Sequence, residues 1–255
     1  MVEAAERAIM PRYGRLASCD VREKAADDLV TIADQESENI LAEGLARILP
    51  EAAIVGEEAV AADPTVLDRL GHSLSWIIDP LDGTRNFAAG DGPFGMLVAL
   101  ADGPDPIGGW IYDPRARRFC SAFRGEGAFV DGQPVRSRGS GSQQPIAAIS
   151  SLFVDPARRV QVQQAVEGVF ETVPIPRCAA EQYPRIVLGV NDVTLYERTL
   201  PWDHAAGVLF LTESGGRASR FDGSPYRVGD HRRGLIAAAT PALWHQTLDL
   251  LHGLD

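Results

Sequence analysis

The feature that most constrains the fold is an apolar run, Trp76 to Ile78, followed at once by Asp79-Pro80-Leu81-Asp82-Gly83-Thr84. The run predicts a short buried strand, and a carboxylate at its end would be costly unless water or a metal ion solvates it. We expect Pro80 to end the strand, because proline cannot donate to the ladder of a sheet. Gly83 to Phe87 can begin a helix whose free N–H groups face the same place. The stretch therefore offers donors to an anion and carboxylates to a cation.

Taken alone, this motif is equally typical of an ordinary turn capped by Asp. Two further acidic motifs favour a functional site instead. Upstream lies Ile54-Val55-Gly56-Glu57-Glu58, an apolar strand that ends in Gly and two glutamates, and downstream lies Trp202-Asp203-His204-Ala205-Ala206-Gly207. Each motif places a carboxylate at the boundary of an expected element. No Gly-x-Ser-x-Gly motif accompanies His204, so we interpret that histidine as structural.

These ordered motifs resemble the inositol monophosphatase family, within the larger group of lithium-sensitive, magnesium-dependent sugar phosphatases. The resemblance covers nearly the whole chain, at Lys24, Asp28 to Asp34, Gly56 to Glu58, Asp79 to Phe87, Trp202 to Gly207 and Glu213 to Gly216. It implies an α+β fold in which helices and sheets form a five-layer αβαβα sandwich, as in fructose-1,6-bisphosphatase and inositol monophosphatase.

The resemblance also implies a site for two or three Mg²⁺ ions. A first ion would be held by Glu57, Asp79 and the backbone carbonyl of Leu81, a second by Asp79, Asp82 and Asp203, and a weaker third near Glu57. The implied catalytic residues are Thr84, Asp34 and Glu57, of which Thr84 and Asp34 would orient the attacking water. The implied substrate-binding residues are Asp82, Gly83, Thr84, Cys178, Ala179 and Glu197, with the N–H groups of Gly83 and Thr84 on the phosphate.

Physical chemistry independently favours a metal-assisted reaction here. Mg²⁺ prefers carboxylate and carbonyl oxygens and keeps waters that a substrate phosphate can replace. Converging carboxylates raise one another's pKa, so a cation is needed to keep them all ionised. Hydrolysis of phosphate monoesters is among the slowest uncatalysed reactions, so positioning alone does not suffice. A metal-activated water attacking in line would require no covalent intermediate.

Composition limits the partners. Lys plus Arg is 24 and Asp plus Glu is 35, which gives a net charge of −11. Such an acidic chain is a poor general binder of nucleic acid and of anionic membranes, and we expect a small phosphorylated substrate. Cys19, Cys120 and Cys178 are widely spaced, which argues against disulfides and zinc. Without a membrane-spanning run, the chain is expected to be cytoplasmic. A homodimer is implied by the resemblance.

Residue patterns predict one domain, 1–255, built from two closely packed halves. The first half, 1–136, is the metal-binding α+β half, and 145–255 is an α/β half that carries Asp203; the polar stretch 137–144 connects them. In the first half we expect helices over 4–16 and 35–49 and strands over 53–55, 74–78, 96–100, 107–112, 118–123 and 127–130. In the second we expect strands over 147–152 and 193–196 and helices over 155–170, 179–188, 203–214 and after Pro241.

The substrate is less constrained. Inositol 1-phosphate is the default by resemblance, and 3'-phosphoadenosine 5'-phosphate, histidinol phosphate and fructose 1,6-bisphosphate are alternatives. The family usually has Gly-Ser/Thr-Ala-Ala where this chain has Arg177-Cys178-Ala179-Ala180. Arg177 supplies either a cation for a second anionic group or a surface side chain. A hypothesis of another class is that the protein acts as a binding partner of the transcription machinery.

Overall fold

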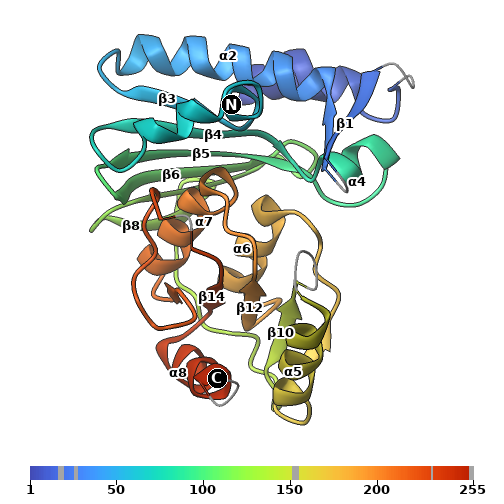
Figure 1. The fold of residues 1–255 in the computed structure, drawn as a ribbon, viewed down its shortest axis with the longest axis vertical. Coiled ribbons are helices and arrows are strands. Elements are labelled where there is room, and N and C mark those ends of the chain that lie inside the picture. The colour runs from blue at the N-terminus through green and yellow to red at the C-terminus, as the bar shows by residue number, and fades with distance from the viewer. Residues whose placement is uncertain (17–19, 26–27, 151–154, 231, 253–255) are drawn as a thin grey trace.

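The computed structural model describes residues 1–16, 20–25, 28–150, 155–230 and 232–252. Helices and sheets alternate in it, as Figure 1 shows: α2 covers a seven-stranded sheet, α6 and α7 lie between this sheet and a second one, and α5 and α8 cover the far side. The expected αβαβα sandwich of the α+β class is confirmed. That all of it belongs to one domain stays a prediction.

The seven-stranded sheet follows the order of the chain. Its strands are β3 (Ala53–Gly56), β4 (Ser75–Asp82), β5 (Gly95–Asp102), β6 (Asp105–Asp113), β7 (Arg118–Phe123), β8 (Gly127–Val130) and β9 (Gln133–Val135). β3 and β4 are parallel, and every later pair is antiparallel. The predicted meander is thus confirmed, and the three-residue β9 extends it.

β4 corrects one expectation, because it continues through Pro80 to Asp82. Asp79 pairs with Leu97 of β5, whereas Asp82 pairs with Gly95, so three steps along β4 match two along β5. This is a β-bulge, one of the few places in a sheet where a residue without an N–H group is tolerated. The expectation that Pro80 ends the strand is therefore wrong, and the bulge instead brings two aspartates to one end of the strand.

One face of this sheet is covered by four helical elements. They are α2 (Ile32–Ile48), α1 (Val2–Ala4) and two short helical turns, η1 (Ala5–Ile9) and η2 (Met10–Arg12). The N-terminal helical stretch ends at Arg12 rather than Leu16. α2 begins three residues earlier than expected because Thr31 and Asp34 form a capping box. Elements that the sequence did not predict are the paired strands β1 (Val21–Ala25) and β2 (Asp28–Thr31), the helix α3 (Glu57–Ala62) and the turn η4 (Pro64–Arg69). The helix expected after Gly83 is α4 (Thr84–Ala89).

The second sheet has the strand order β11-β10-β12-β14-β13. Its strands are β10 (Ile146–Ile149), β11 (Glu171–Val173), β12 (Val193–Tyr196), β13 (Arg217–Ser219) and β14 (Leu235–Ala238), of which only β10 and β12 were predicted. The helices are α5 (Pro156–Val166), α6 (Ala179–Val187), α7 (Pro201–Glu213) and α8 (Pro241–His252). α5 ends four residues earlier than expected. The expected end of the strand 147–152 falls partly outside the described residues.

α6 and α7 are in very close contact between the sheets. A Cβ built on Gly207 of α7 would lie 2.0 Å from the Tyr183 ring of α6, so only glycine fits there. The connection 136–145 joins the two sheets, and the Asp192 carboxylate fixes it by accepting hydrogen bonds from the amides of Ser140 and Ile146, each at 2.7 Å. Among the described residues, no helix has the length and apolar character needed to cross a membrane.

Candidate metal and phosphate site

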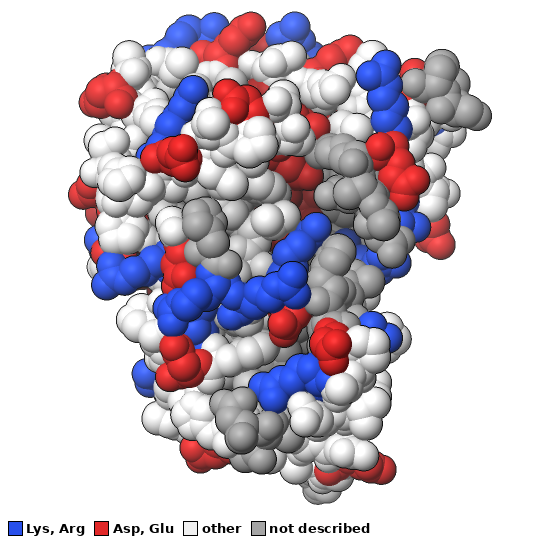
Figure 2. Space-filling view, in the orientation of Figure 1, with Lys and Arg blue, Asp and Glu red and all other residues white. Residues whose placement is uncertain are grey.

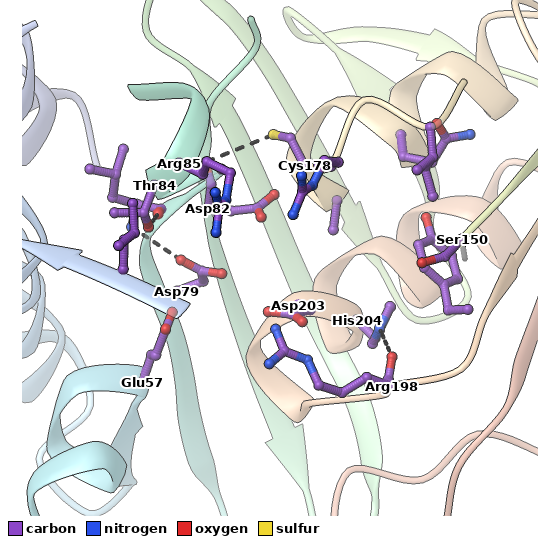
Figure 3. Close-up of a pocket in the computed structure, with 18 residues that line it drawn as sticks. Glu57, Asp79, Asp82, Thr84, Arg85, Ser150, Cys178, Arg198, Asp203 and His204 are labelled. Carbon is purple, nitrogen blue, oxygen red and sulfur yellow. Dashed lines mark hydrogen bonds between the residues drawn. The ribbon is translucent and has the colours of Figure 1, made fainter. Parts of the chain in front are cut away.

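One cavity of about 160 Å³ lies where α6 and α7 meet the end of β4, and Figure 3 shows its lining. It contains most of the site residues predicted from the sequence, namely Glu57, Asp79, Leu81, Asp82, Gly83, Thr84, Cys178, Ala179 and Asp203. Asp34 lies behind Thr84 instead of lining the cavity. Glu197 lines a neighbouring cavity of about 680 Å³ and is absent from this one. The side chains of Lys24 and Asp28, and all of Cys19, lie outside the described part of the structure.

The bulge in β4 places Asp79 and Asp82 at the cavity. Asp79 is 1 % exposed, and its Oδ1 accepts a hydrogen bond of 3.1 Å from the Leu81 amide. Burial raises the pKa of Asp79 well above its ordinary value, and the nearby charges of Glu57 and Asp82, among others, raise it further. An ionised Asp79 is therefore costly in the metal-free protein, and a cation would relieve this cost.

A hydrogen bond connects Asp82 to the second half of the chain. Its Oδ2 accepts a 2.6 Å hydrogen bond from the Ala180 amide in the first turn of α6, and the Cys178 thiol lies 3.8 Å from its backbone oxygen. Burial raises the pKa of Asp82, and these donors partly oppose the effect. The start of α6 thus holds one oxygen of the carboxylate in place.

Glu57 is the first residue of α3, and a buried neighbour fixes the start of that helix. The Glu38 carboxylate of α2 accepts hydrogen bonds of 2.8 Å from the amides of Glu58 and Ala59. These are two of the free N–H groups at a helix start, so Glu38 caps α3 from a distant part of the chain. Glu38 could not be predicted from the sequence, because only packing brings it to this position.

Thr84 and Asp34 are joined as expected. The Thr84 hydroxyl lies 3.1 Å from Asp34 Oδ1 and 2.9 Å from the Leu81 carbonyl oxygen, so it can donate its proton to either. Asp34 Oδ2 accepts from the Thr31 amide at 2.8 Å and from the Thr31 hydroxyl at 2.6 Å. Burial raises the pKa of Asp34 to about 7, although the Thr31 bonds oppose this.

Asp203 and His204 stand in the first turn of α7 and have different surroundings. Asp203 lines the cavity. His204 is buried, with Nδ1 2.9 Å from the Tyr183 hydroxyl and Nε2 3.2 Å from the Arg198 carbonyl oxygen. Burial lowers the pKa of His204 to about 3, so the ring is neutral at pH 7. These contacts support the structural interpretation of this histidine.

Several other residues line the cavity and were not predicted from the sequence as parts of the site. They are Leu29, Arg85, Ser150, Ile175, Arg177, Gln182, Tyr196 and Arg198. Figure 3 shows the Arg198 side chain directed toward Asp203 and that of Arg85 beside Asp82. Within the described residues, the buried Tyr196 hydroxyl has no hydrogen-bond partner. Burial raises the pKa of Tyr196 well above its ordinary value, so this hydroxyl stays protonated and can donate to a bound ligand.

The donor set fits a hard cation such as Mg²⁺. It consists of carboxylates and one backbone carbonyl, while His204 is engaged elsewhere. Among the described residues, no group of three or more His, Cys, Asp or Glu side chains is arranged to hold a metal ion unaided. Mg²⁺ usually binds through one or two carboxylates and completes its shell with water and substrate phosphate. The assignment of individual ligands to each ion stays a prediction.

Comparison with known proteins decides the family. The inositol monophosphatase family matches residues 1–252. The chain belongs to the inositol monophosphatase family. Most of the relatives that the comparisons name are phosphatases, and this chain is a phosphoric monoester hydrolase of the inositol monophosphatase type.

Relatives within the family carry different names. An inositol-1-monophosphatase of Caulobacter vibrioides is 32% identical over 98% of this chain and 99% of its own length. A histidinol-phosphatase of Mycobacterium tuberculosis is 31% identical over 96% of this chain and 92% of its own. Among solved structures, the Thermotoga maritima IMPase has a TM-score of 0.82 at 22% identity, with 100% of this chain and 94% of that one covered. The family is metal-dependent in general, which agrees with the acidic cavity.

Proposed function

We propose that this phosphatase hydrolyses the phosphate monoester of a small sugar or polyol with the help of two or three Mg²⁺ ions. The proposal rests on one observation: four carboxylates and a threonine line the same small cavity. They are Glu57, Asp79, Asp82, Asp203 and Thr84. Inositol 1-phosphate is the default substrate because the family and several relatives bear that name.

The chain's own residues have distinct roles in this proposal. Glu57, Asp79 and the Leu81 carbonyl would hold one ion, and Asp79, Asp82 and Asp203 would hold another. Bound Mg²⁺ supplies charge neutralisation of the phosphate and a lowered pKa for the attacking water. The backbone N–H groups of Gly83 and Thr84 hold the phosphate.

Water activation also depends on the buried pair behind the cavity. Because Thr84 donates its proton to Asp34 or Leu81, its lone pairs are left to accept a hydrogen bond from the attacking water. This contact orients the water in line with the leaving oxygen. We assign catalytic roles to Thr84 and Asp34 on this basis, and to Glu57 because it would hold one of the ions. Cys178 and Ala179 line the side on which the alcohol moiety would lie, and Glu197 would act only from the neighbouring cavity.

A substrate panel tests the proposal. Phosphate release would be measured with inositol 1-phosphate, 3'-phosphoadenosine 5'-phosphate, histidinol phosphate and fructose 1,6-bisphosphate, each with Mg²⁺, with EDTA and with added Li⁺. We expect Mg²⁺-dependent, Li⁺-sensitive turnover of one compound far above the rest, because a site built to pair substrate hydroxyls rejects analogues that leave its polar groups unpaired. Turnover that EDTA leaves unchanged would refute the metal-dependent reaction.

A second candidate function is favoured by one relative. A protein of Xylella fastidiosa named Nus factor SuhB is 26% identical over 88% of this chain. We therefore retain binding to the transcription machinery as the alternative. Asp79→Asn separates the two: if it abolishes phosphate release while a growth phenotype of the deletion strain is still complemented, the binding role is the physiological one.

From the same family likeness we propose that the protein is a homodimer and that it is cytoplasmic. We also propose that lithium inhibits its phosphatase activity. The acidic charge of −11 supports a small-molecule substrate over nucleic acid or an anionic membrane. Size-exclusion chromatography with light scattering measures the oligomeric state directly. A monomeric mass at micromolar concentration would refute the dimer.

A further inference from the structure

Arg177 adopts a backbone conformation that disfavours its side chain. Its φ is 56°, in the left-handed region, where the described residues place only three residues other than glycine. This conformation crowds the Cβ of an L-residue and costs roughly 1–2 kcal/mol, whereas glycine adopts it freely. A strained residue at a candidate site indicates that its side chain has a functional role, such as binding a ligand.

Contacts on both sides of Arg177 keep its backbone in this strained conformation. The Asn86 side-chain amide of α4 donates to the carbonyl oxygens of Pro176 at 3.0 Å and Pro93 at 2.8 Å. On the other side, the segment after Arg177 packs on β4: a Cβ built on Gly83 would lie 3.3 Å from the Cys178 Cβ. The backbone of Arg177 is therefore fixed next to the residues expected to hold the phosphate.

The Arg177 side chain is available to a ligand. The residue is exposed and lines the cavity, and among the described residues it forms neither a hydrogen bond nor an ion pair. Arg85 and Arg198 line the same cavity. Figure 2 shows basic side chains gathered across the middle of this face, beside a recess in which acidic side chains are visible. Three arginines gathered at one cavity of a chain with a net charge of −11 favour the binding of an anion beside them.

Tyr196 adds a neutral donor on the same cavity. Its ring stacks on Tyr183 at 5.8 Å and meets His204 edge-on at 4.6 Å, so it is held firmly. Its buried hydroxyl has no partner in the described part of the chain, and an unsatisfied donor of this kind costs free energy until a ligand oxygen accepts from it. A substrate oxygen near Arg177 would satisfy it.

We propose that Arg177 binds a second anionic group on the alcohol half of the substrate, so that the preferred substrate is a small phosphate monoester that carries another phosphate or a carboxylate. The inference rests on the proposed phosphatase function and names its substrate class. The guanidinium suits this role because its planar fork pairs with two oxygens of a phosphate or carboxylate. The reacting phosphate is expected instead at Gly83, Thr84 and the metal ions.

Matched pairs of substrates test the proposal. The ratio of kcat/KM would be measured for fructose 1,6-bisphosphate over fructose 1-phosphate and for inositol 1,4-bisphosphate over inositol 1-phosphate; phosphoglycolate over glyceryl phosphate represents a carboxylate. We expect the wild type to prefer the doubly anionic member of at least one pair. In Arg177→Gly and Arg177→Gln this preference should fall by roughly 10–100-fold, as expected for a lost charge-assisted bond, and Arg177→Lys should keep part of it.

Arg117 provides a matched control. It is also an exposed arginine with a positive φ, 54°, but it lies in the turn between β6 and β7, outside the cavity. Arg117→Gly relieves the same strain and should leave every ratio unchanged. If Arg177→Gly lowers kcat/KM equally for both members of each pair, Arg177 acts on the reacting phosphate and the proposal is overturned. A wild type without preference overturns it as well, whereas no Mg²⁺-dependent turnover of any compound refutes the phosphatase function itself.

Discussion

Gly56 and Glu38 are in direct contact: a Cβ built on Gly56 would lie 2.3 Å from the carboxyl carbon of Glu38. The same carboxylate caps α3 through the amides of Glu58 and Ala59. A side chain at position 56 would therefore collide with the capping carboxylate of Glu38. This carboxylate in turn fixes the start of the helix that begins at Glu57.

Gly56→Ala should consequently displace Glu38 and break both capping bonds. We expect a loss of about 1–3 kcal/mol in the free energy of unfolding and weaker Mg²⁺ binding, measured by urea denaturation and by isothermal titration calorimetry. Gly44→Ala in α2 is the control, since a Cβ there meets nothing within 4 Å. Alanine at an open helical position should stabilise the protein by up to ~1 kcal/mol. Equal effects of the two substitutions would contradict this account.

Asp79→Asn should separate metal binding from stability. Removal of the buried charge relieves desolvation and repulsion, so the metal-free variant is expected to be at least as stable as the wild type. Mg²⁺ should raise the melting temperature of the wild type and leave that of the variant unchanged, because ligand binding to the folded state stabilises it. Phosphatase activity should fall more than about 100-fold. Unchanged Mg²⁺ affinity and activity would refute the proposed role of Asp79 as a ligand of both ions.

Thr84→Ala tests the orientation of the attacking water. The variant loses the hydroxyl that contacts Asp34 and Leu81. We expect kcat to fall by roughly 10²-fold with little change in KM, because the contact matters mainly in the transition state. Thr84→Ser retains the hydroxyl and should keep most of the activity. A large increase in KM with unchanged kcat would assign Thr84 to substrate binding instead.

Asp230 provides a prediction on acid stability away from the cavity. Hydrogen bonds from Arg232, together with the charge of the buried Arg220, lower the pKa of Asp230 from 3.8 to about 2. The unfolded state therefore takes up this proton first as the pH falls, so the stabilisation is complete above pH 4 and is lost between about pH 4 and pH 2. Asp230→Asn should cost about 1–2 kcal/mol at pH 7. Guanidinium titrations should show this difference shrinking below pH 4; a difference that stays constant with pH would contradict the linkage.

Much of the architecture could be predicted because it depends on local pattern. The strands from β5 to β8 are rich in apolar residues and are separated by turns such as Asp113-Pro114, and α7 begins at a proline. Most of the missed strands, including β13 and β14, are only three or four residues long, and β14 is stabilised by pairing with β12 and β13, which lie earlier in the chain. β4 was cut short because proline usually ends a strand, and a bulge overrides that preference.

The acidic residues of the site could be found for a related reason: carboxylates at element boundaries stand out in a sequence. Glu38 could not, because it looks like any helical glutamate until α2 and α3 pack. Arg198 was equally hidden, since its neighbour Glu197 appeared the better candidate and only the path of the chain into α7 turns Arg198 toward Asp203.

The bulge between Asp79 and Asp82 has a consequence for how such chains evolve. Because one extra residue in β4 brings both aspartates to the cavity, their common side depends on the bulge as well as on the two residues themselves. If this stretch of β4 became a regular strand of the same length, the second aspartate would turn to the opposite face, because positions three residues apart lie on opposite faces of a strand. A descendant with such a straightened strand would keep the sandwich and both aspartates but lose its chemistry, so the presence of the two aspartates does not by itself identify an active enzyme in genome surveys.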